Sequence, residues 1–171
     1  LRHQASQEGI HIMGLQEART AAGTRQADGY FIIASGCAAD GKNLGVELWL
    51  STEKPYHHGD GKSYRFNQKH CVVIKATPRL LIVRIEADLF SATVIVAHAP
   101  CMSGHSREER ELWWTDLSDD LAMYGGDFLL IDANGRLGSV HTTSVGAQGY
   151  AQVEDHNGSL FHELLLQGNL A

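Results

Sequence analysis

The chain has 171 residues, of which 43% are hydrophobic and 20% are charged, and its net charge is −6 with His neutral. This length is enough to bury a core, and we expect residues 1–171 to form a single domain. No apolar run approaches the roughly 18–20 residues of a membrane span, so we expect no membrane partner. The acidic balance argues against a protein held on DNA by a broad basic face. It is compatible with carboxylates that bind a divalent cation.

The cysteine pattern excludes two kinds of small scaffold. Cys37, Cys71 and Cys101 are odd in number and widely spaced, and no Cys-x-x-Cys pair occurs. A zinc knuckle or a disulfide framework would need such pairs. We therefore interpret the cysteines as small apolar residues of the core. The pattern favours a reducing compartment, and we expect an intracellular protein of the nucleus or cytoplasm.

Short apolar runs separated by Gly and other turn residues predict many strands and few helices in the first part of the chain. The predicted strands cover residues 10–15, 30–34, 44–51, 70–75, 79–87 and 91–98. Between them we expect a short helix or loop at 18–26, a turn at 40–43 and a surface loop at 52–68. The short connections between the last three strands favour antiparallel hairpins.

Helical signals appear in the second part of the chain. Ser106 and Glu109 have the spacing of a capping box, and Gly125 and Gly126 end the helix that it starts. Residues 107–111 are predicted to form a solvated face of this helix. Apolar residues recur along it at helical spacing and predict a buried stripe: Leu112, Trp113, Leu117, Leu121 and Tyr124.

A strand at 127–131, continuous enough to be buried on both faces, follows this helix, and 156–167 read as a last helix. The order of the elements predicts an α/β (α+β) sandwich with sheets inside and helices outside.

Asp132 and Asn134 directly follow the strand predicted at 127–131. Residues i and i+2 project on one side of an extended chain. A carboxylate can bind Mg²⁺ or orient an attacking water, and an amide can contact a phosphate oxygen. The alternative is an ordinary turn, because Asp-x-Asn-Gly is also a good turn sequence.

Three further polar residues lie at or next to predicted strand ends. Glu17 follows the run 10–15, His98 ends the run 91–98, and Arg136 lies close to Asp132. Glu17 can be a metal ligand or a solvated residue. His98 can donate to a phosphate oxygen or hold its own backbone, and Arg136 is a candidate phosphate contact. The adjacent His57 and His58 point in different directions on any regular element, so we interpret them as solvated.

Together these segments resemble the endonuclease/exonuclease/phosphatase superfamily. Its members include pancreatic-type deoxyribonucleases, sphingomyelinases, inositol-polyphosphate phosphatases and LINE-type retrotransposon endonucleases. The matching segments are IMGLQEA (12–18), LGVELWLS (44–51), RLLIVRIEA (79–87), TVIVAHAP (93–100), DFLLIDANGRLGS (127–139) and NGSLFHELLLQGNLA (157–171). The resemblance implies a deoxyribonuclease-I-like fold, in which two packed, mainly antiparallel sheets are flanked by helices.

The resemblance also implies a role for each candidate residue. Glu17 matches a metal ligand, and Asp132 matches the group that handles the attacking water or the metal. Asn134 matches a phosphate contact, and His98 matches the His of the deoxyribonuclease-like His-x-Pro segment. The implied cofactor is Mg²⁺, with Mn²⁺ as an alternative, and the implied activity is endonucleolytic hydrolysis of DNA phosphodiester bonds.

Two parts of the family pattern have no counterpart in residues 1–171. The family carries an Asn on an earlier strand and a Ser-Asp-His-like segment after the last helix. We therefore expect a domain that is incomplete at both ends, and weak or no nicking of DNA by these residues alone. Two alternatives stay open: a phosphatase or lipid phosphodiesterase of the same fold, and a truncated, non-catalytic domain.

Overall fold

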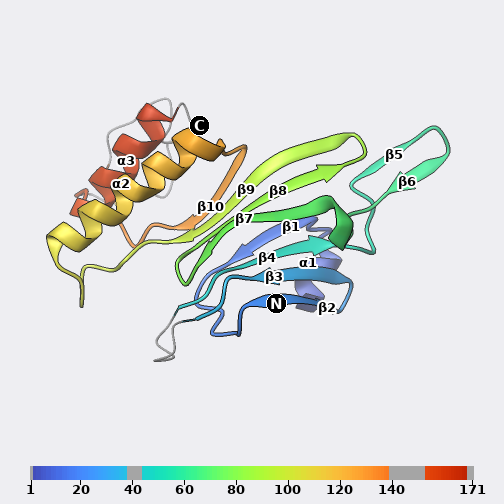
Figure 1. The fold of residues 1–171 in the computed structure, drawn as a ribbon, viewed down its shortest axis with the longest axis horizontal. Coiled ribbons are helices and arrows are strands. Elements are labelled where there is room, and N and C mark those ends of the chain that lie inside the picture. Colours follow the sequence, from blue (N-terminus) through green and yellow to red (C-terminus); the bar gives the residue numbers. More distant parts are fainter. Residues whose placement is uncertain (1, 38–43, 139–152, 169–171) are drawn as a thin grey trace. The chain divides into compact units, whose positions relative to one another are not determined.

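The computed structural model describes residues 2–37, 44–138 and 153–168 (Figure 1). The turn predicted at 40–43 lies outside them. The chain divides into two compact units. Unit 1 comprises Leu1–His98 and Gly126–Ile131, and unit 2 comprises Ala99–Gly125 and Asp132–Ala171.

The first sheet of unit 1 has four antiparallel strands in the order β1-β4-β3-β2. These strands are β1 (Ile12–Leu15), β2 (Gly23–Ala27), β3 (Tyr30–Ala34) and β4 (Glu47–Ser51), and the short helix α1 (Arg2–Gln7) precedes them. The short helix or loop predicted at 18–26 is wrong in its second half, where β2 forms. Asp28 and Gly29, both at positive φ, make the two-residue hairpin turn that pairs β2 with β3.

The second sheet of unit 1 has the order β10-β9-β8-β7. Its strands are β7 (Cys71–Thr77), β8 (Leu80–Ala87), β9 (Phe90–His98) and β10 (Phe128–Asp132). The antiparallel hairpins predicted for residues 70–98 are confirmed. The expectation that residues 127–131 are buried on both faces is wrong. β10 is an edge strand of this sheet, its residues are half-buried or exposed, and Phe128 is exposed.

A small hairpin replaces the surface loop predicted at 52–68. It consists of β5 (His57–Gly59) and β6 (Lys62–Tyr64), joined by Asp60 and Gly61 at positive φ. This is the Asp-Gly turn that favours tight hairpins, and it lies inside a segment too polar to show a strand pattern. The 3₁₀ helix η1 (Gln68–His70) then leads into β7.

The main core of unit 1 draws on both sheets. Alternate residues of β3, β4, β8 and β9 meet there, because successive side chains of a strand point to opposite faces. Its buried members are Phe31, Ile33, Val46, Leu48, Leu50, Phe66, Leu81, Val83, Ile85, Val94 and Val96. The opposite face of the first sheet has its own cluster, where Ala5 of α1 joins Tyr30, Ile32 and Trp49.

Unit 2 contains the helices α2 (Arg107–Tyr124) and α3 (His156–Gln167). The capping box of Ser106 and Glu109 is confirmed, and Gly125 ends α2. The predicted apolar stripe is displaced by about one residue: Trp114 and Leu117 are buried, whereas Leu112 is exposed. Arg110 of the predicted solvated face is buried as well, and its Nη1 donates to the carbonyl of His105.

The sandwich of two four-stranded, mostly antiparallel sheets with accompanying helices is the fold class predicted from the sequence. None of the helices in the described ranges is long and apolar enough to cross a membrane. Cys37, Cys71 and Cys101 are all free, as predicted, but each is half-buried rather than part of the core interior. Burial raises the pKa of the Cys71 thiol to about 11, so this thiol stays protonated and unreactive at neutral pH.

Candidate active site

Glu17 follows β1, and its side chain is exposed. Its φ is 53°, a conformation that a Glu residue rarely adopts. Two backbone hydrogen bonds hold the next residues in place: Ala18 N–H donates to Gly45 O and Arg19 N–H to Leu44 O. The Glu17 carboxylate lies 3.4 Å from the guanidinium of Arg19, and both groups are largely exposed. The fold therefore presents an accessible carboxylate on a constrained backbone.

A buried carboxylate, Glu47 on β4, supports the segment after Glu17. It accepts hydrogen bonds from Thr20 Oγ1 at 2.6 Å and from the guanidinium of Arg25 and the indole of Trp49, each at 2.7 Å. Burial alone would raise the pKa of Glu47, but the three hydrogen bonds and the charge of Arg25 outweigh it, and the net pKa is lowered. Glu47 is therefore an ionised anchor of this segment. The sequence reading missed it, although a Glu inside the apolar run LGVELWLS is a signal for a paired buried charge.

The residue before Glu17 joins the two sheets of unit 1. Gln16 Nε2 donates to the carbonyl of Leu130 on β10 at 3.2 Å. The sheets approach closely here, because a Cβ at Gly14 of β1 would lie 2.8 Å from Leu130 Cβ. The end of β1 is thereby fixed against β10, two residues before Asp132.

His98 ends β9 and is only 5% exposed. Its N–H donates to Arg79 O at 2.9 Å, and its carbonyl accepts from Arg79 Nη1 at 3.3 Å. Both partner atoms belong to Arg79, the residue before β8, so the backbone of His98 is held on the sheet. The structural role that the sequence allowed for His98 is thus present, and in this conformation its ring offers little surface to a ligand.

β10 runs parallel to β9. Asp127 N–H donates to Thr93 O before β10 begins, and Ala99 N–H donates to Asp132 O where both strands end. Hydrogen bonds between residues that advance together along both strands mark a parallel pair. The chain therefore leaves this sheet after His98 and after Asp132 at the same sheet end.

Asp132, Ala133 and Asn134 form a tight turn in unit 2. Asn134 N–H donates to Asp132 Oδ1 at 2.9 Å, and Asn134 Nδ2 donates to Ala99 O at 2.8 Å. Asn134 has a φ of 45°, which Asn tolerates better than most residues. The Asp132 side chain remains exposed. The turn that the sequence offered as an alternative to a catalytic pair is therefore present, and it also presents an accessible carboxylate beside an amide.

Asn157, in the first turn of α3, holds this turn from behind and is 0% exposed. Its Nδ2 donates to Pro100 O at 2.9 Å and to Asn134 O at 3.0 Å. Because these acceptors are carbonyls, the amide orientation is settled by its partners. Its Oδ1 has no hydrogen-bond partner within the described residues. The sequence did not predict this anchoring role of Asn157.

Two glycines bring α3 and this turn together. A Cβ at Gly135 would lie 2.6 Å from Gly158 N, and a Cβ at Gly158 would collide with Arg136 O. Asp155 caps α3 by accepting from Gly158 N–H at 2.8 Å, and its own N–H donates to Arg136 O at 3.2 Å. The side chain of Arg136, the predicted phosphate contact, is exposed. The turn from Asp132 to Arg136 is therefore shaped by the start of α3.

The donor chemistry of the candidate residues fits Mg²⁺ in kind. Glu17 and Asp132 offer exposed carboxylate oxygens, the hard ligands that Mg²⁺ prefers. Within the described ranges there is no cluster of three or more His, Cys, Asp or Glu residues that could hold a metal ion. Mg²⁺ is usually bound by one or two carboxylates, with water and substrate phosphate completing its shell. Either carboxylate can serve in such a site.

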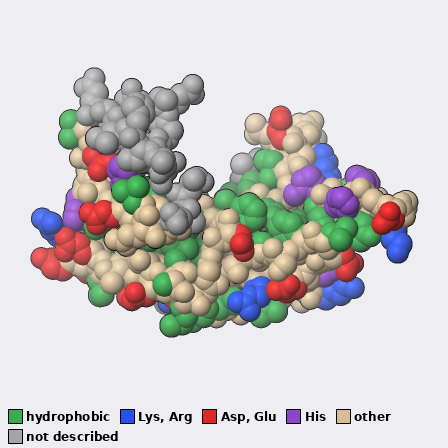
Figure 2. Space-filling model, turned by 90° about the horizontal axis from the view of Figure 1, so that it is seen from above, with side chains coloured by type: hydrophobic (Ala, Val, Ile, Leu, Met, Phe, Trp, Pro, Cys, Tyr) green, Lys and Arg blue, Asp and Glu red, His purple; other side chains and the backbone are tan. Residues whose placement is uncertain are grey.

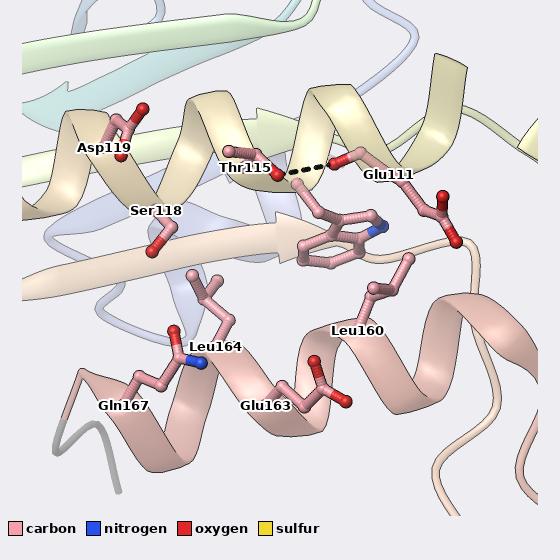
Figure 3. Close-up of a pocket in the computed structure, with 9 residues that line it drawn as sticks. Glu111, Thr115, Ser118, Asp119, Leu160, Glu163, Leu164 and Gln167 are labelled. Carbon is pink, nitrogen blue, oxygen red and sulfur yellow. Dashed lines mark hydrogen bonds between the residues drawn. The ribbon is translucent and has the colours of Figure 1, made fainter. Parts of the chain in front are cut away.

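A pocket between α2 and α3 is distinct from all of these residues (Figure 3). Trp114, Leu160 and Leu164 supply its apolar part, and Glu111, Asp119 and Glu163 supply carboxylates. In Figure 3 the Thr115 hydroxyl donates to the carbonyl of Glu111, so it is already used inside α2. Carboxylates around a pocket repel phosphate, so this pocket does not fit a phosphodiester.

The structure brings Asp132, Asn134 and Arg136 together in one turn of unit 2. Glu17 and His98 lie in unit 1, each at the end of a strand. His57 and His58 are exposed on β5, as expected.

Comparisons with known proteins place this arrangement among solved folds. No protein-family model matches the sequence, and no curated protein matches it. Among solved structures, the chain matches the "Endonuclease domain of TRAS1, a telomere-specific non-LTR retrotransposon", with a TM-score of 0.54 and 15% sequence identity. The match covers 96% of this chain and 61% of that chain, so the chain spans about 61% of the length of the TRAS1 domain.

Identity at this level shows a shared fold. It supports the resemblance drawn from the sequence segments, and it confirms the predicted fold class. The chain therefore shares the fold of the TRAS1 endonuclease domain.

Proposed function

We propose that this chain hydrolyses phosphodiester bonds with the help of Mg²⁺ or Mn²⁺, and that its substrate is nucleic acid, DNA in the first place. The observation that carries the proposal is the Asp132–Asn134 turn. In a fold shared with an endonuclease domain, it holds an exposed carboxylate and an amide in one fixed conformation at a strand end. Preorganised groups of this kind are what phosphoryl-transfer chemistry requires of a protein.

Each candidate residue has a role in this proposal. The exposed carboxylates of Glu17 and Asp132 are each a candidate ligand for the metal ion, which would supply charge stabilisation at the phosphate when bound. The Asp132 carboxylate also orients the attacking water and accepts its proton. Asn134 keeps one amide hydrogen beyond its bond to Ala99 O, and this hydrogen is available to a phosphate oxygen.

The structure supports a phosphate contact more directly for Arg136 than for His98. Arg136 is exposed and next to the turn, so its guanidinium can bind phosphate directly. His98 is buried, so a direct phosphate contact would require its ring to become accessible. We assign it first the positioning of the chain where β9 ends.

Two observations beyond the turn support the proposal. Glu17 and Asn134, two of the residues proposed from the sequence, are both non-glycine residues at positive φ. Strained backbone conformations of this kind concentrate at functional sites. Both residues are also supported by a buried neighbour. Glu47 supports the segment of Glu17, and Asn157 supports the turn of Asn134.

The proposal is tested by nicking of supercoiled plasmid DNA with Mg²⁺, with Mn²⁺ and with EDTA. We expect a low but measurable metal-dependent rate that falls at least about 100-fold in Asp132→Asn, because the variant loses the carboxylate. Asp116→Asn is the matched control, since it makes the same change at an exposed residue of α2, and it should keep the wild-type rate.

Three results would contradict the proposal. Nicking that persists in EDTA would show that the reaction needs no metal ion. Nicking that survives Asp132→Asn would show that the Asp132 carboxylate is not catalytic. Hydrolysis of sphingomyelin or a phosphoinositide without hydrolysis of DNA would replace nucleic acid with a lipid substrate on the same fold.

A further inference from the structure

The charges of the chain are unevenly distributed. Residues 54–70, here called the basic arm, carry a net positive charge, although the chain as a whole is acidic. This segment contains Lys54, Lys62, Arg65 and Lys69 but only one acidic residue, Asp60. It also contains three His residues. With His neutral the arm carries +3 of a net charge of −6, so the remaining residues carry −9. A local excess of this kind is the electrostatic signature of a polyanion contact.

The basic arm contains a projecting hairpin, and aromatic side chains pack the base of this hairpin against unit 1 (Figure 1). Tyr56 stacks on Phe66 with ring centroids 4.4 Å apart, and its hydroxyl donates to Asp88 O at 2.6 Å. Phe66 is buried in the main core and meets Phe90 edge-on at 5.3 Å. An aromatic ladder therefore fixes the base of the hairpin, so its tip is presented in a defined orientation.

The tip carries a cation beside two flat rings: Lys62 and His57 are exposed, and Tyr64 is half-buried. His57 pairs with Tyr64 across the two strands, with ring centroids 5.8 Å apart, and Gly59 pairs with Lys62. Paired residues share a face of a hairpin, so His57, Tyr64 and Lys62 lie on the same face. The ring of His57 lies over Gly59, where an added Cβ would come within 2.8 Å of its Nε2.

Two further cations of the arm are also accessible. Lys69 is exposed on η1. Arg65 is exposed as well, and its Nε donates to Glu53 O at 2.8 Å, which orients the guanidinium and leaves its terminal nitrogens for a ligand. Figure 2 shows several His side chains gathered at the end of unit 1 where β5 and β6 lie, with Lys or Arg and a few acidic side chains beside them.

We propose that the basic arm binds the phosphate backbone of nucleic acid. The inference rests on the proposed function only in its choice of polyanion. Lys62, Arg65 and Lys69 would pair with phosphates, and the rings of His57 and Tyr64 would meet sugar or exposed bases. A lipid surface fits less well, because the arm exposes no Leu, Ile, Val, Phe or Trp that could enter a bilayer.

The test measures binding without catalysis. A fluorescein-labelled 20-base-pair DNA duplex and a single strand of the same length are titrated with protein in EDTA at several KCl concentrations. We expect Lys62→Gln/Lys69→Gln to weaken binding about tenfold near 0.1 M salt. The slope of log K against log salt should fall by about 2, one for each phosphate contact removed.

The matched control removes two positive charges elsewhere. Arg84 on β8 and Arg107 on α2 are both exposed, and the double variant Arg84→Gln/Arg107→Gln has the same net charge as the arm variant. It should bind DNA within about twofold of the wild type. Circular dichroism and thermal unfolding confirm that both variants are folded, which is expected because all four side chains are on the surface.

Several outcomes would overturn the inference. An arm variant that binds as tightly as the wild type would show that the arm makes no contact. Equal losses of DNA affinity in both double variants would show that binding depends on the net charge of the protein and not on the arm. Arm-dependent binding to phosphatidylserine vesicles without arm-dependent binding to DNA would assign the arm to a membrane. Because no hydrolysis is measured, failure here leaves the proposed nuclease activity standing, and failure of plasmid nicking leaves arm-dependent binding standing.

Discussion

The segment after β1 and the turn after β10 both present an exposed carboxylate, but they are held by opposite means. Glu17 is supported by a buried charge, since Glu47 gathers Thr20, Arg25 and Trp49 around an ionised carboxylate. The turn of Asp132 is supported by a neutral amide, since Asn157 donates to carbonyls at 0% exposure. The stabilisation from a buried carboxylate depends on pH, whereas that from a buried amide does not. The two supports can therefore be tested separately.

The largest effect is expected from Asn157→Asp, which turns the neutral support into a charged one. At neutral pH the new carboxylate would face the carbonyls of Pro100 and Asn134 without a donor, so we expect a loss of about 4 kcal/mol in the free energy of unfolding. Protonation would let the group donate again. The pKa of the new carboxyl is therefore raised in the folded state, and the variant should be closest to wild type in acid and weakest at neutral pH.

Urea unfolding between pH 4 and 8 measures this effect. Gln167→Glu is the control, because it makes the same amide-to-carboxylate change at an exposed position of α3 and should cost less than about 0.5 kcal/mol. Hydrogen exchange at Asn134 N–H gives a local reading, since that group donates to Asp132 Oδ1. Unchanged exchange in Asn157→Asp would mean that Asn157 does not hold the turn.

Glu47→Gln should have the next largest effect and the opposite dependence on pH. The new NH₂ group would face at least one of the donors from Thr20, Arg25 and Trp49, so we expect a loss of about 2–3 kcal/mol at neutral pH. The pKa of Glu47 is lowered by folding, so its contribution is present above its usual value of 4.5 and is lost as the pH falls through the folded value. The difference between variant and wild type should therefore shrink in acid.

Glu86→Gln is the control for this variant, because Glu86 is exposed on β8 and its carboxylate accepts a hydrogen bond from the exposed hydroxyl of Ser91. A constant difference between Glu47→Gln and wild type from pH 7 to pH 3 would contradict the assignment of Glu47 as an ionised anchor. Opposite pH trends for the two supports would establish the contrast between them.

The sequence predicted the presented residues better than their supports. Glu17, His98, Asp132 and Asn134 stand at strand ends, which short apolar runs reveal because burial sets their length and boundaries. Glu47 and Asn157 are polar residues whose partners lie far away in sequence, Arg25 and Pro100 among them. A Glu within an apolar run can mark a buried charge, but no local pattern identifies the partners of either residue. The same reason explains the β5–β6 hairpin, because its strands lack an apolar face and form around the Asp60-Gly61 turn.

The helix caps offer the smallest and most selective test, because one cap belongs to the turn of Asp132 and the other does not. Asp155 accepts from Gly158 N–H at the start of α3, and Ser106 accepts from Glu109 N–H at the start of α2. Replacing either by Ala should cost about 1 kcal/mol. Only Asp155→Ala should also slow plasmid nicking and speed exchange at Asn134 N–H, because the start of α3 packs on the carbonyl of Arg136. Equal nicking rates in the two variants, at equal loss of stability, would show that the position of α3 does not matter to the turn.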